Sequence, residues 1–210
     1  MTQAHEQVAE PVGVRRILGP TILMGDGAYF DYEAPETSAI TIEDVAFGLA
    51  FTARFRGQTR ALRATGNRVF YSVAEHCVRM AQEMIAEGYG ERLALAGLMH
   101  ELGEVPLGDM PSPAKMMLPD FKALEKRLEA ALWEQFDLPS LTEDDVRIVK
   151  AFDLRMLATE KRDLMTGSIP GDRWEMLEGF QPFAAMTITP YFHPHLAAEA
   201  FLRLWGYLHG

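Results

Sequence analysis

Residues 91–102 form a segment that is apolar nearly all the way round when it is placed on a helix, with Leu93, Leu95, Ala96, Leu98 and Met99 on several faces. A helix without a polar face lies buried at the centre of a protein, so other elements must surround it. The chain has 210 residues, of which 48% are hydrophobic, which suffices for one soluble domain with a sizeable core. We therefore expect helices packed round a central helix.

Apolar residues at helical spacing, together with N-cap patterns, predict the surrounding helices. Thr41 with Asp44 three residues later begins a helix that runs to about Ala53, and Ser72 with Glu75 begins one that stops near Gly88. The same signals predict three more helices, over 120–136, from Thr142 to about Met165, and from about Pro194 to His209.

Two stretches interrupt the helical pattern. The turn Gly25-Asp26-Gly27 separates Thr21–Met24 from Ala28–Phe30 and predicts a short hairpin. The stretch 105–119 is rich in proline, so we expect a rigid loop there instead of a regular helix. We therefore predict an all-α protein: a single compact helical domain over 19–210 with a minor N-terminal β-hairpin, preceded by a flexible tail over 1–18.

Composition narrows the classes of function. The single cysteine, Cys77, excludes an intramolecular disulfide framework and a cysteine-based zinc site. No apolar stretch reaches the ~20 residues that a membrane span needs, and the N-terminus lacks the pattern of a signal peptide, so we expect a cytoplasmic protein. The net charge of −10 argues against binding of long nucleic acid, but not against a small phosphorylated ligand.

The stretch 54–68 is locally basic, because it holds five arginines and no acidic residue: Arg54, Arg56, Arg60, Arg63 and Arg68. Two interpretations stay open. It is a solvated basic loop, or an electropositive rim that captures a phosphate beside an acidic pocket.

Polar residues with metal-binding chemistry lie at the end of the apolar segment. His100 and Glu101 are adjacent, with Glu104 and Asp109 close behind. An imidazole beside a carboxylate offers a nitrogen and an oxygen donor to a divalent ion, although adjacent polar residues are also common at a solvated helix end.

Two further candidates lie on other predicted helices. Asp153 lies among Phe152, Leu154 and other apolar residues, where a buried carboxylate needs a cation or hydrogen bonds; alternatively it lies on a polar stripe and pairs with Lys150. His76 lies in an apolar helix, where a hydrogen-bonded core histidine is the alternative to a ligand.

Three segments together resemble a known family: Tyr-Ser-Val-Ala-Glu-His at 71–76, Leu-Met-His-Glu-Leu-Gly-Glu-Val-Pro-Leu-Gly-Asp-Met-Pro-Ser-Pro-Ala-Lys at 98–115, and Phe-Asp-Leu-Arg-Met-Leu-Ala-Thr-Glu at 152–160. Over about residues 20–165 the chain resembles the HD-domain metal-dependent phosphohydrolases, in particular their 5'-deoxynucleotidase-like branch. The resemblance implies one divalent metal ion, such as Mn, Co, Zn or Mg. It would be held by His76, His100, Glu101 and Asp153.

The resemblance also implies roles for neighbouring residues. Glu104 resembles the catalytic glutamate that orients or deprotonates water, and Asp109 the residue that assists the leaving oxygen. Arg54 matches the arginine that contacts the substrate phosphate. Lys115 either meets a phosphate or is an exposed lysine without a role, and Glu160 is expected to brace the structure or an arginine.

The implied activity is hydrolysis of phosphate from a nucleotide, most simply a deoxynucleoside 5'-monophosphate, and family members are often dimers, so a homodimer is an expectation. The aromatic residues near the C-terminus form either a flap on the chain's own core, which we expect, or a partner surface: Trp174, Phe180, Phe183, Tyr191, Phe192 and Trp205.

The chain departs from the family pattern at three places. Glu101 stands where the family has aspartate, which moves the carboxylate oxygens one methylene further out. Gln58 stands where related sequences have histidine. Residues 61–69 resemble an insertion. Two alternatives therefore stay open beside the hydrolase. One is an HD-like protein that binds a nucleotide or metal without turnover, and the other is a structural helical module whose polar cluster is satisfied internally.

Overall fold

A computed structural model describes residues 19–61, 65–165, 172–191 and 193–210. Within them lie the strands β1 (Thr21–Leu23) and β2 (Tyr29–Asp31) and the helices α1 (Ile42–Phe51), α2 (Val73–Ala86), α3 (Gly90–Met99), α4 (Glu104–Leu107), α5 (Ser112–Met117), α6 (Pro119–Gln135), α7 (Glu143–Leu164) and α8 (Pro194–His209). Short 3₁₀ turns occur at η1 (Pro35–Thr37), η2 (Arg54–Gly57) and η3 (Glu175–Leu177). The expected mostly helical fold with an N-terminal hairpin is confirmed.

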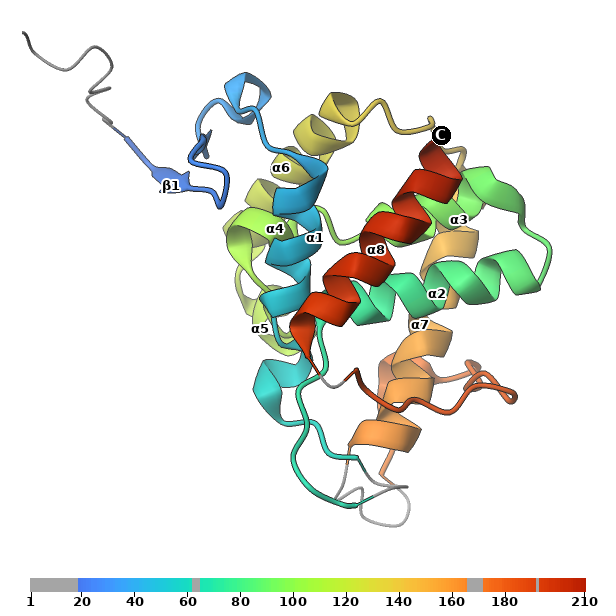
Figure 1. The fold of residues 1–210 in the computed structure, drawn as a ribbon. Coiled ribbons are helices and arrows are strands. Elements are labelled where there is room, and N and C mark those ends of the chain that lie inside the picture. Colours follow the sequence, from blue (N-terminus) through green and yellow to red (C-terminus); the bar gives the residue numbers. More distant parts are fainter. Residues whose placement is uncertain (1–18, 62–64, 166–171, 192) are drawn as a thin grey trace, which may run out of the picture.

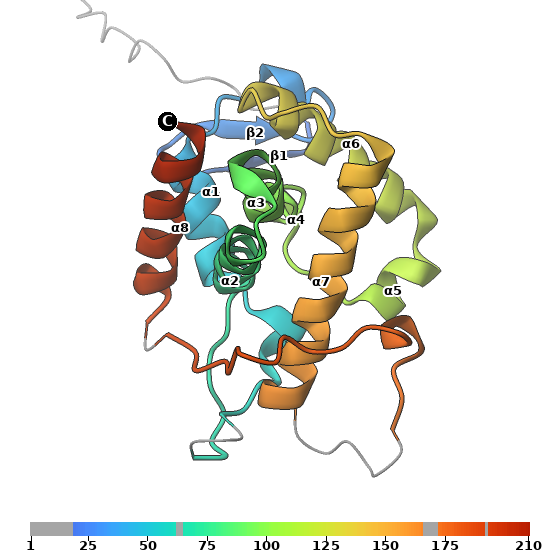
Figure 2. The ribbon, with the colours of Figure 1, turned by 90° about the vertical axis from the view of Figure 1, so that its right-hand side faces the viewer.

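The helices pack in layers round α2 and α3. Seen along their length, α2 and α3 lie one against the other, with α1 and α8 on one side and α7 on the other (Figure 2). All of α3 from Leu93 to Met99 is buried, as a helix apolar on every face requires. The central position of α3 places it against both α2 and α7 (Figure 1), and His100 is the residue that follows its last turn.

A glycine allows α3 to approach α2 closely. A Cβ atom at Gly97 would lie 2.4 Å from the sulfur of Met84 and 3.4 Å from the terminal methyl of Met80, both on α2. A methyl group at this position would therefore force the two helices or the methionines apart. The contact holds the last turns of α3 against α2.

The predicted helix starts are set by local hydrogen bonds. Thr41 and Asp44 form a capping box at α1, and Thr142 and Asp145 form another at α7. The hydroxyl of Ser72 accepts a hydrogen bond from the Glu75 backbone N–H at 3.1 Å, which begins α2. These bonds fix where α2 and α7 begin, and therefore where His76 lies along α2 and where Asp153 lies along α7.

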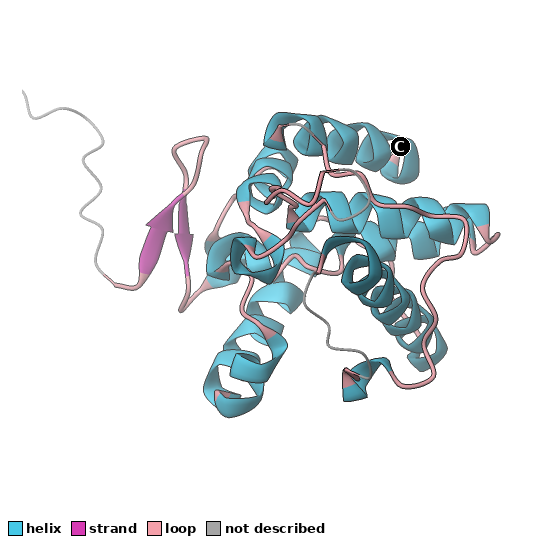
Figure 3. Cartoon of the chain, turned by 90° about the horizontal axis from the view of Figure 1, so that it is seen from below, coloured by secondary structure: helices cyan, strands magenta, loops and turns pink. Residues whose placement is uncertain are grey.

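The hairpin lies to one side of the helices (Figure 3). Its two strands pair antiparallel, with Ile22 opposite Phe30. Phe30 is fully buried in the core, whereas Leu23 and Tyr29 are exposed. The hairpin is thus attached to the helices through Phe30 and, at its turn, through the Asp26 N–H, which donates to Asp44 Oδ1 at 3.2 Å.

The prediction of a loop over 105–119 is wrong in part, because most of α4 and all of α5 lie in this stretch. Pro113 lies in the first turn of α5, where its missing N–H is not needed for helical hydrogen bonding. The central helix is also shorter than expected, since it ends at Met99 and leaves His100 as its C-cap.

The C-terminal aromatic residues that the structure describes pack partly on the core, as expected. Phe183 is buried, and Tyr191 and Trp205 contact the core while partly exposed. Phe192, Arg63 and the predicted tail over 1–18 lie outside the described residues. Among the described helices, none has the length and apolar character to cross a membrane.

Candidate metal centre

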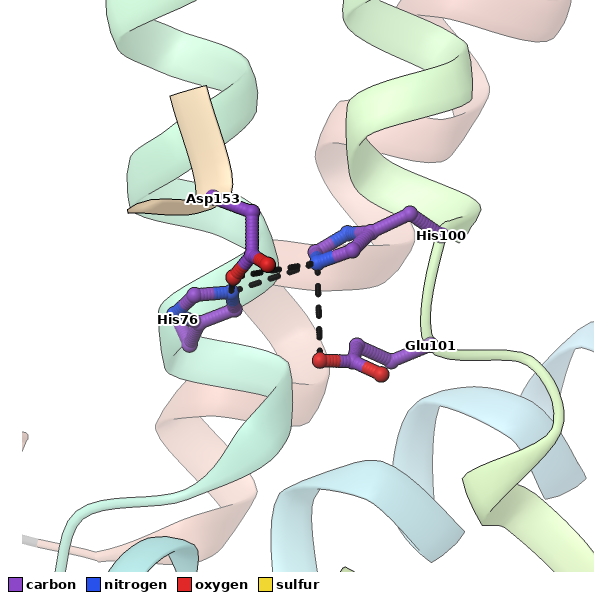
Figure 4. Close-up of side chains that lie close together, drawn as sticks. All are labelled: His76, His100, Glu101 and Asp153. Atoms are coloured by element: carbon purple, nitrogen blue, oxygen red, sulfur yellow. Dashed lines mark hydrogen bonds and ion pairs between the residues drawn. The ribbon is translucent and has the colours of Figure 1, made fainter. Parts of the chain in front are cut away.

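Four predicted ligands converge from three parts of the fold. His76 lies in the first turn of α2, His100 and Glu101 follow the end of α3, and Asp153 lies in the middle of α7 (Figure 4). One ligand atom from each side chain lies within 4.8 Å of all the others. The four residues form a group that could hold a metal ion, as the sequence indicated.

The separations between these atoms suit a bound cation. The Nε2 atoms of His76 and His100 are 3.3 Å apart, and His76 Nε2 is 3.4 Å from Asp153 Oδ1. His100 Nε2 is 3.5 Å from Glu101 Oε1 and 3.9 Å from Asp153 Oδ1. Ligands at about 2.0–2.2 Å from a tetrahedral ion are about 3.3–3.6 Å from one another, so three of these four separations fall in that range.

The outer nitrogen of each histidine is already engaged. His76 Nδ1 is 2.6 Å from Glu160 Oε1, and His100 Nδ1 is 2.7 Å from the Gly97 carbonyl oxygen. An N–H donated to these acceptors leaves both Nε2 atoms with lone pairs that point into the cluster, as in metal-ligating histidines. The centre is then lined by acceptors.

The electrostatics of the cluster favour positive charge. Burial opposes a charge on His100, yet the carboxylate of Glu101 and the groups of Cys77 and Asp153 hold the pKa of His100 well above its ordinary value. Burial raises the pKa of Asp153, but its contacts with His100 and His76 hold it well below the usual range. Without a metal ion, a proton on His100 supplies part of the positive charge that these carboxylates favour.

Both alternatives weighed for Asp153 are present, one on each oxygen. Its Oδ1 faces the histidines, while its Oδ2 accepts a hydrogen bond from Lys150 at 2.6 Å. His76 is likewise both a fully buried, hydrogen-bonded core histidine and a member of the cluster.

Glu104 lies in a buried position at the start of α4. One oxygen, Oε1, is 3.3 Å from Lys115 Nζ, whereas Oε2 has no hydrogen-bond partner among the described residues. Burial, together with the charges of Glu101 and Asp109, raises the pKa of Glu104 to about 8. Such a carboxyl exchanges a proton near neutral pH, as a general acid or base does.

Asp109 and Lys115 border Glu104 from the segment that follows. Burial raises the pKa of Asp109, although Arg54 and the Phe55 backbone N–H favour its charged form. Lys115 donates to Glu125 Oε1 at 2.6 Å as well as to Glu104. Lys115 is therefore engaged within the protein, which differs from the exposed lysine considered as an alternative.

Arg54 is buried beside the cluster and does not line an open rim. Its Nη2 donates to Glu160 Oε2 at 3.1 Å, and its Nη1 is 3.5 Å from Glu101 Oε1. Elsewhere in the basic stretch, Arg60 donates to the Gly66 carbonyl and Arg68 to the Gln58 side chain. The described arginines of this stretch thus bind within the loop or the core, except for the exposed Arg56.

The turn that carries Arg54 has an unusual backbone. Phe55 and Arg56 both have φ of 53°, and Gly57 continues in the left-handed region with φ of 71°. Each such non-glycine residue costs about 1–3 kcal/mol, so the surrounding structure must hold it in place. The turn aims the Arg54 side chain inward and the Phe55 N–H at Asp109.

Glu160 and Glu129 extend the site beyond the predicted ligands. Glu160 pairs with Arg54, as the sequence analysis anticipated, and also contacts His76. Glu129 on α6 was not predicted as a site residue from the sequence. Burial raises the pKa of Glu129, while the charge of His100 lowers it. The signal that could have placed α6 here is Gly103, where a Cβ would lie 3.1 Å from Glu125 Cγ and 3.6 Å from Glu129 Cβ.

A surface hollow of about 490 Å³ lies elsewhere, between Tyr89 and the outer face of α7, with Phe152 and Arg155 in its lining. None of the candidate site residues lines it. The chemistry therefore favours the four-residue cluster over this hollow as the functional site.

The fold and the cluster together define a mostly helical protein with a candidate single-metal centre. No model of a known protein family matches the chain. The chain is 34% identical over 164 residues to the uncharacterized protein YfdR of Escherichia coli (strain K12), which covers 78% of this chain and 82% of YfdR. It therefore belongs to the same family as YfdR.

A second relative is the uncharacterized protein RCAP_rcc00048 of Rhodobacter capsulatus. The two chains are 41% identical over 135 residues, which covers 62% of this chain and 65% of the relative.

Proposed function

We propose that the protein is a metal-dependent phosphohydrolase of the HD-domain type that acts on a nucleotide, most simply a deoxynucleoside 5'-monophosphate. The observation that carries the proposal is the convergence of His76, His100, Glu101 and Asp153 within 4.8 Å, with both inward-facing nitrogens free of protons once their Nδ1 atoms donate outward. Two nitrogens and two carboxylates suit Mn, Co or Zn, with Mg favoured less because it prefers oxygen ligands.

The residues beside the cluster support hydrolysis. A divalent ion at this position would supply Lewis acidity, which activates water and polarises a phosphoryl oxygen. Glu104 has a pKa of about 8 and a buried oxygen, Oε2, with no hydrogen-bond partner in the described part of the chain, so it is suited to take the proton of the attacking water. Asp109 has a raised pKa as well, and a protonated carboxyl there can donate to the leaving oxygen.

Binding of the phosphate requires positive charge. The cation would contribute most of it, and Arg54 and Lys115 would add to it. Both side chains are now paired with carboxylates, Arg54 with Glu101 and Glu160 and Lys115 with Glu104 and Glu125. A phosphate dianion would therefore compete with these carboxylates for the side chains of Arg54 and Lys115.

That competition supports a second candidate function, a protein that binds a metal or nucleotide without turnover. If Arg54 and Lys115 stay paired with their carboxylates, the cluster can hold a metal ion while neither of these two side chains is free to bind a phosphate. The two functions share the metal centre and differ in what happens at phosphorus.

The test is phosphate release from a panel of deoxyribonucleoside and ribonucleoside 5'-phosphates, with Mn, Co, Zn or Mg added in turn and after chelation. We expect metal-dependent release that is greatest for a monophosphate. The matched variant Glu104→Gln should keep its metal and lose turnover by roughly 100-fold or more. Stoichiometric metal without release from any nucleotide would favour the binding protein, and no bound metal would end both the hydrolase and the metal-binding protein.

A further inference from the structure

Glu160 links two of the candidate ligands although it is not one of them. It lies on α7 two turns after Asp153 and is fully buried. A carboxylate withdrawn from water is costly unless its oxygens are paired. Both oxygens of Glu160 are paired, Oε1 with His76 Nδ1 at 2.6 Å and Oε2 with Arg54 Nη2 at 3.1 Å.

The contact with His76 decides which ring nitrogen faces the cluster. The ion pair between Glu160 Oε2 and Arg54 Nη2, at 3.1 Å, favours the carboxylate form of Glu160. A carboxylate at 2.6 Å accepts the Nδ1–H of His76 and thereby leaves Nε2 without a proton. His76 Nε2 is the atom that faces His100 and Asp153.

The contact with Arg54 reaches a second ligand. Arg54 lies between two acids, with Nη2 on Glu160 and Nη1 3.5 Å from Glu101 Oε1. This Glu101 oxygen is the one that lies 3.5 Å from His100 Nε2. Since Glu160 fixes one end of the planar guanidinium, the other end limits where the longer side chain of Glu101 places its oxygens.

We propose that Glu160 is the positioning residue of the metal centre: it orients His76 directly and Glu101 through Arg54, and it does not itself bind the ion. The inference rests on the metal centre of the proposed function but not on hydrolysis. It predicts that removing the charge of Glu160 weakens metal binding although all four ligands remain.

A matched control lies one residue before His76. Glu75 is also a buried glutamate paired with an arginine, since its Oε1 accepts from Arg79 Nη2 at 2.7 Å and its Oε2 from the Tyr191 backbone N–H at 3.1 Å. It makes no contact with the four ligands among the interactions of the described residues. Glu75→Gln should therefore lower stability as Glu160→Gln does, without the effect on metal binding.

The experiment compares Zn and Co affinities of the wild-type protein, Glu160→Gln and Glu75→Gln by competition with a chelator. We expect roughly a 10–100-fold loss of affinity in Glu160→Gln and less than about a 3-fold change in Glu75→Gln. The visible spectrum of the Co-loaded protein should change in Glu160→Gln only, because the ligand positions change there. Equal affinities in the two variants would overturn the proposal.

A measurement on the wild-type protein keeps the test independent of folding of the variants. The ring ¹⁵N shifts of His76 in the Zn-loaded protein should show a protonated Nδ1 and a metal-bound Nε2. A metal-bound Nδ1 would overturn the proposal. Absence of nucleotide hydrolysis with the expected affinities and shifts would leave the positioning role intact and contradict only the hydrolase.

Discussion

The site contains two groups of buried or partly buried acids whose charges are balanced differently. In the ligand cluster (His76, His100, Glu101 and Asp153) the atoms that face one another are acceptors, and the neighbouring cations bind from outside, Lys150 on the outer oxygen of Asp153. In the lysine bridge (Glu104, Lys115 and Glu125) the ammonium group lies between the carboxylates, 3.3 Å from Glu104 and 2.6 Å from Glu125.

The two groups therefore differ in the source of their positive charge: a side chain in the lysine bridge, and a bound ion in the ligand cluster. The lysine bridge supplies its own cation, Lys115, which pairs with Glu125 and lies beside the carboxyl group of Glu104. Among the described residues no lysine or arginine lies between the four ligand atoms, and without a metal ion only a proton on His100 offsets the acidic charge there. A bound divalent ion would supply the missing charge, and binding only to the folded state would stabilise the protein.

The largest predicted effect is loss of metal binding in Asp153→Asn. The variant keeps the size of the side chain but removes a negative ligand, so we expect metal affinity to fall by more than about 100-fold, beyond the range found for residues that only support ligands. The measurement is metal content after dialysis together with a chelator titration. Asp144→Asn, an exposed acid on the same helix paired with Arg147, should bind metal like the wild type, and unchanged affinity in Asp153→Asn would contradict the comparison.

A smaller effect is expected for Glu101→Asp, which restores the residue of the family pattern. The Glu101 carboxylate already lies 3.5 Å from both His100 Nε2 and Arg54 Nη1. Shortening it by one methylene withdraws the oxygen from both, so metal affinity should fall by about 10-fold, a free-energy change of about 1.4 kcal/mol. Titration calorimetry with Mn and Zn measures this loss. Tighter binding with a large gain in phosphate release would instead show that glutamate impairs the centre.

The local parts of this architecture could be predicted from sequence, and the long-range pairings could not. The caps at Thr41, Ser72 and Thr142 depend on residues three positions apart, so a short window contains them. The partners of Arg54 lie 47 and 106 residues away, at Glu101 and Glu160. A run of arginines therefore resembled a phosphate rim, while the fold turned its first member inward.

The ligands were predictable because their chemistry is unusual in their surroundings, as a carboxylate among apolar residues is at Asp153. Glu129 gave no such signal, because it lies on an amphipathic helix where glutamates are ordinary. The packing of α6 on Gly103 lies beside Glu129, whose pKa the nearby charge of His100 affects.

The lysine bridge predicts a pH dependence for the metal-free protein. Glu104 has a pKa of about 8 in the folded chain and about 4.3 when unfolded. Between these values the folded state holds a proton that the unfolded state has released, so stability is fully present below about pH 4.3 and is lost as the pH rises toward 8. Glu104 alone contributes at most one proton to this slope, about 1.4 kcal/mol per pH unit.

Urea unfolding in chelator at pH 5.5, 6.5 and 7.5 measures this slope. We expect the free energy of unfolding to fall as the pH rises, and Glu104→Gln to flatten the dependence. Other groups whose pKa values are raised, His100, Asp109 and Glu129 among them, contribute to the slope that remains. A Glu104→Gln variant with the wild-type slope would show that Glu104 is ionised throughout this range.

The smallest effect is expected for Lys115→Met, which removes the cation of the lysine bridge. The Lys115 side chain is 21% exposed, so the lost ion pairs should destabilise the protein by only about 1 kcal/mol. Metal affinity should stay within about 3-fold of the wild type or rise slightly, because removal of a positive charge near Glu101 strengthens attraction of a cation. Asp153→Asn should lose metal binding, because the ligand cluster depends on a bound ion for its positive charge. Lys115→Met should instead lose stability, because the lysine bridge obtains its positive charge from Lys115. A loss of metal affinity in Lys115→Met as large as that in Asp153→Asn would mean that the two groups act as one site.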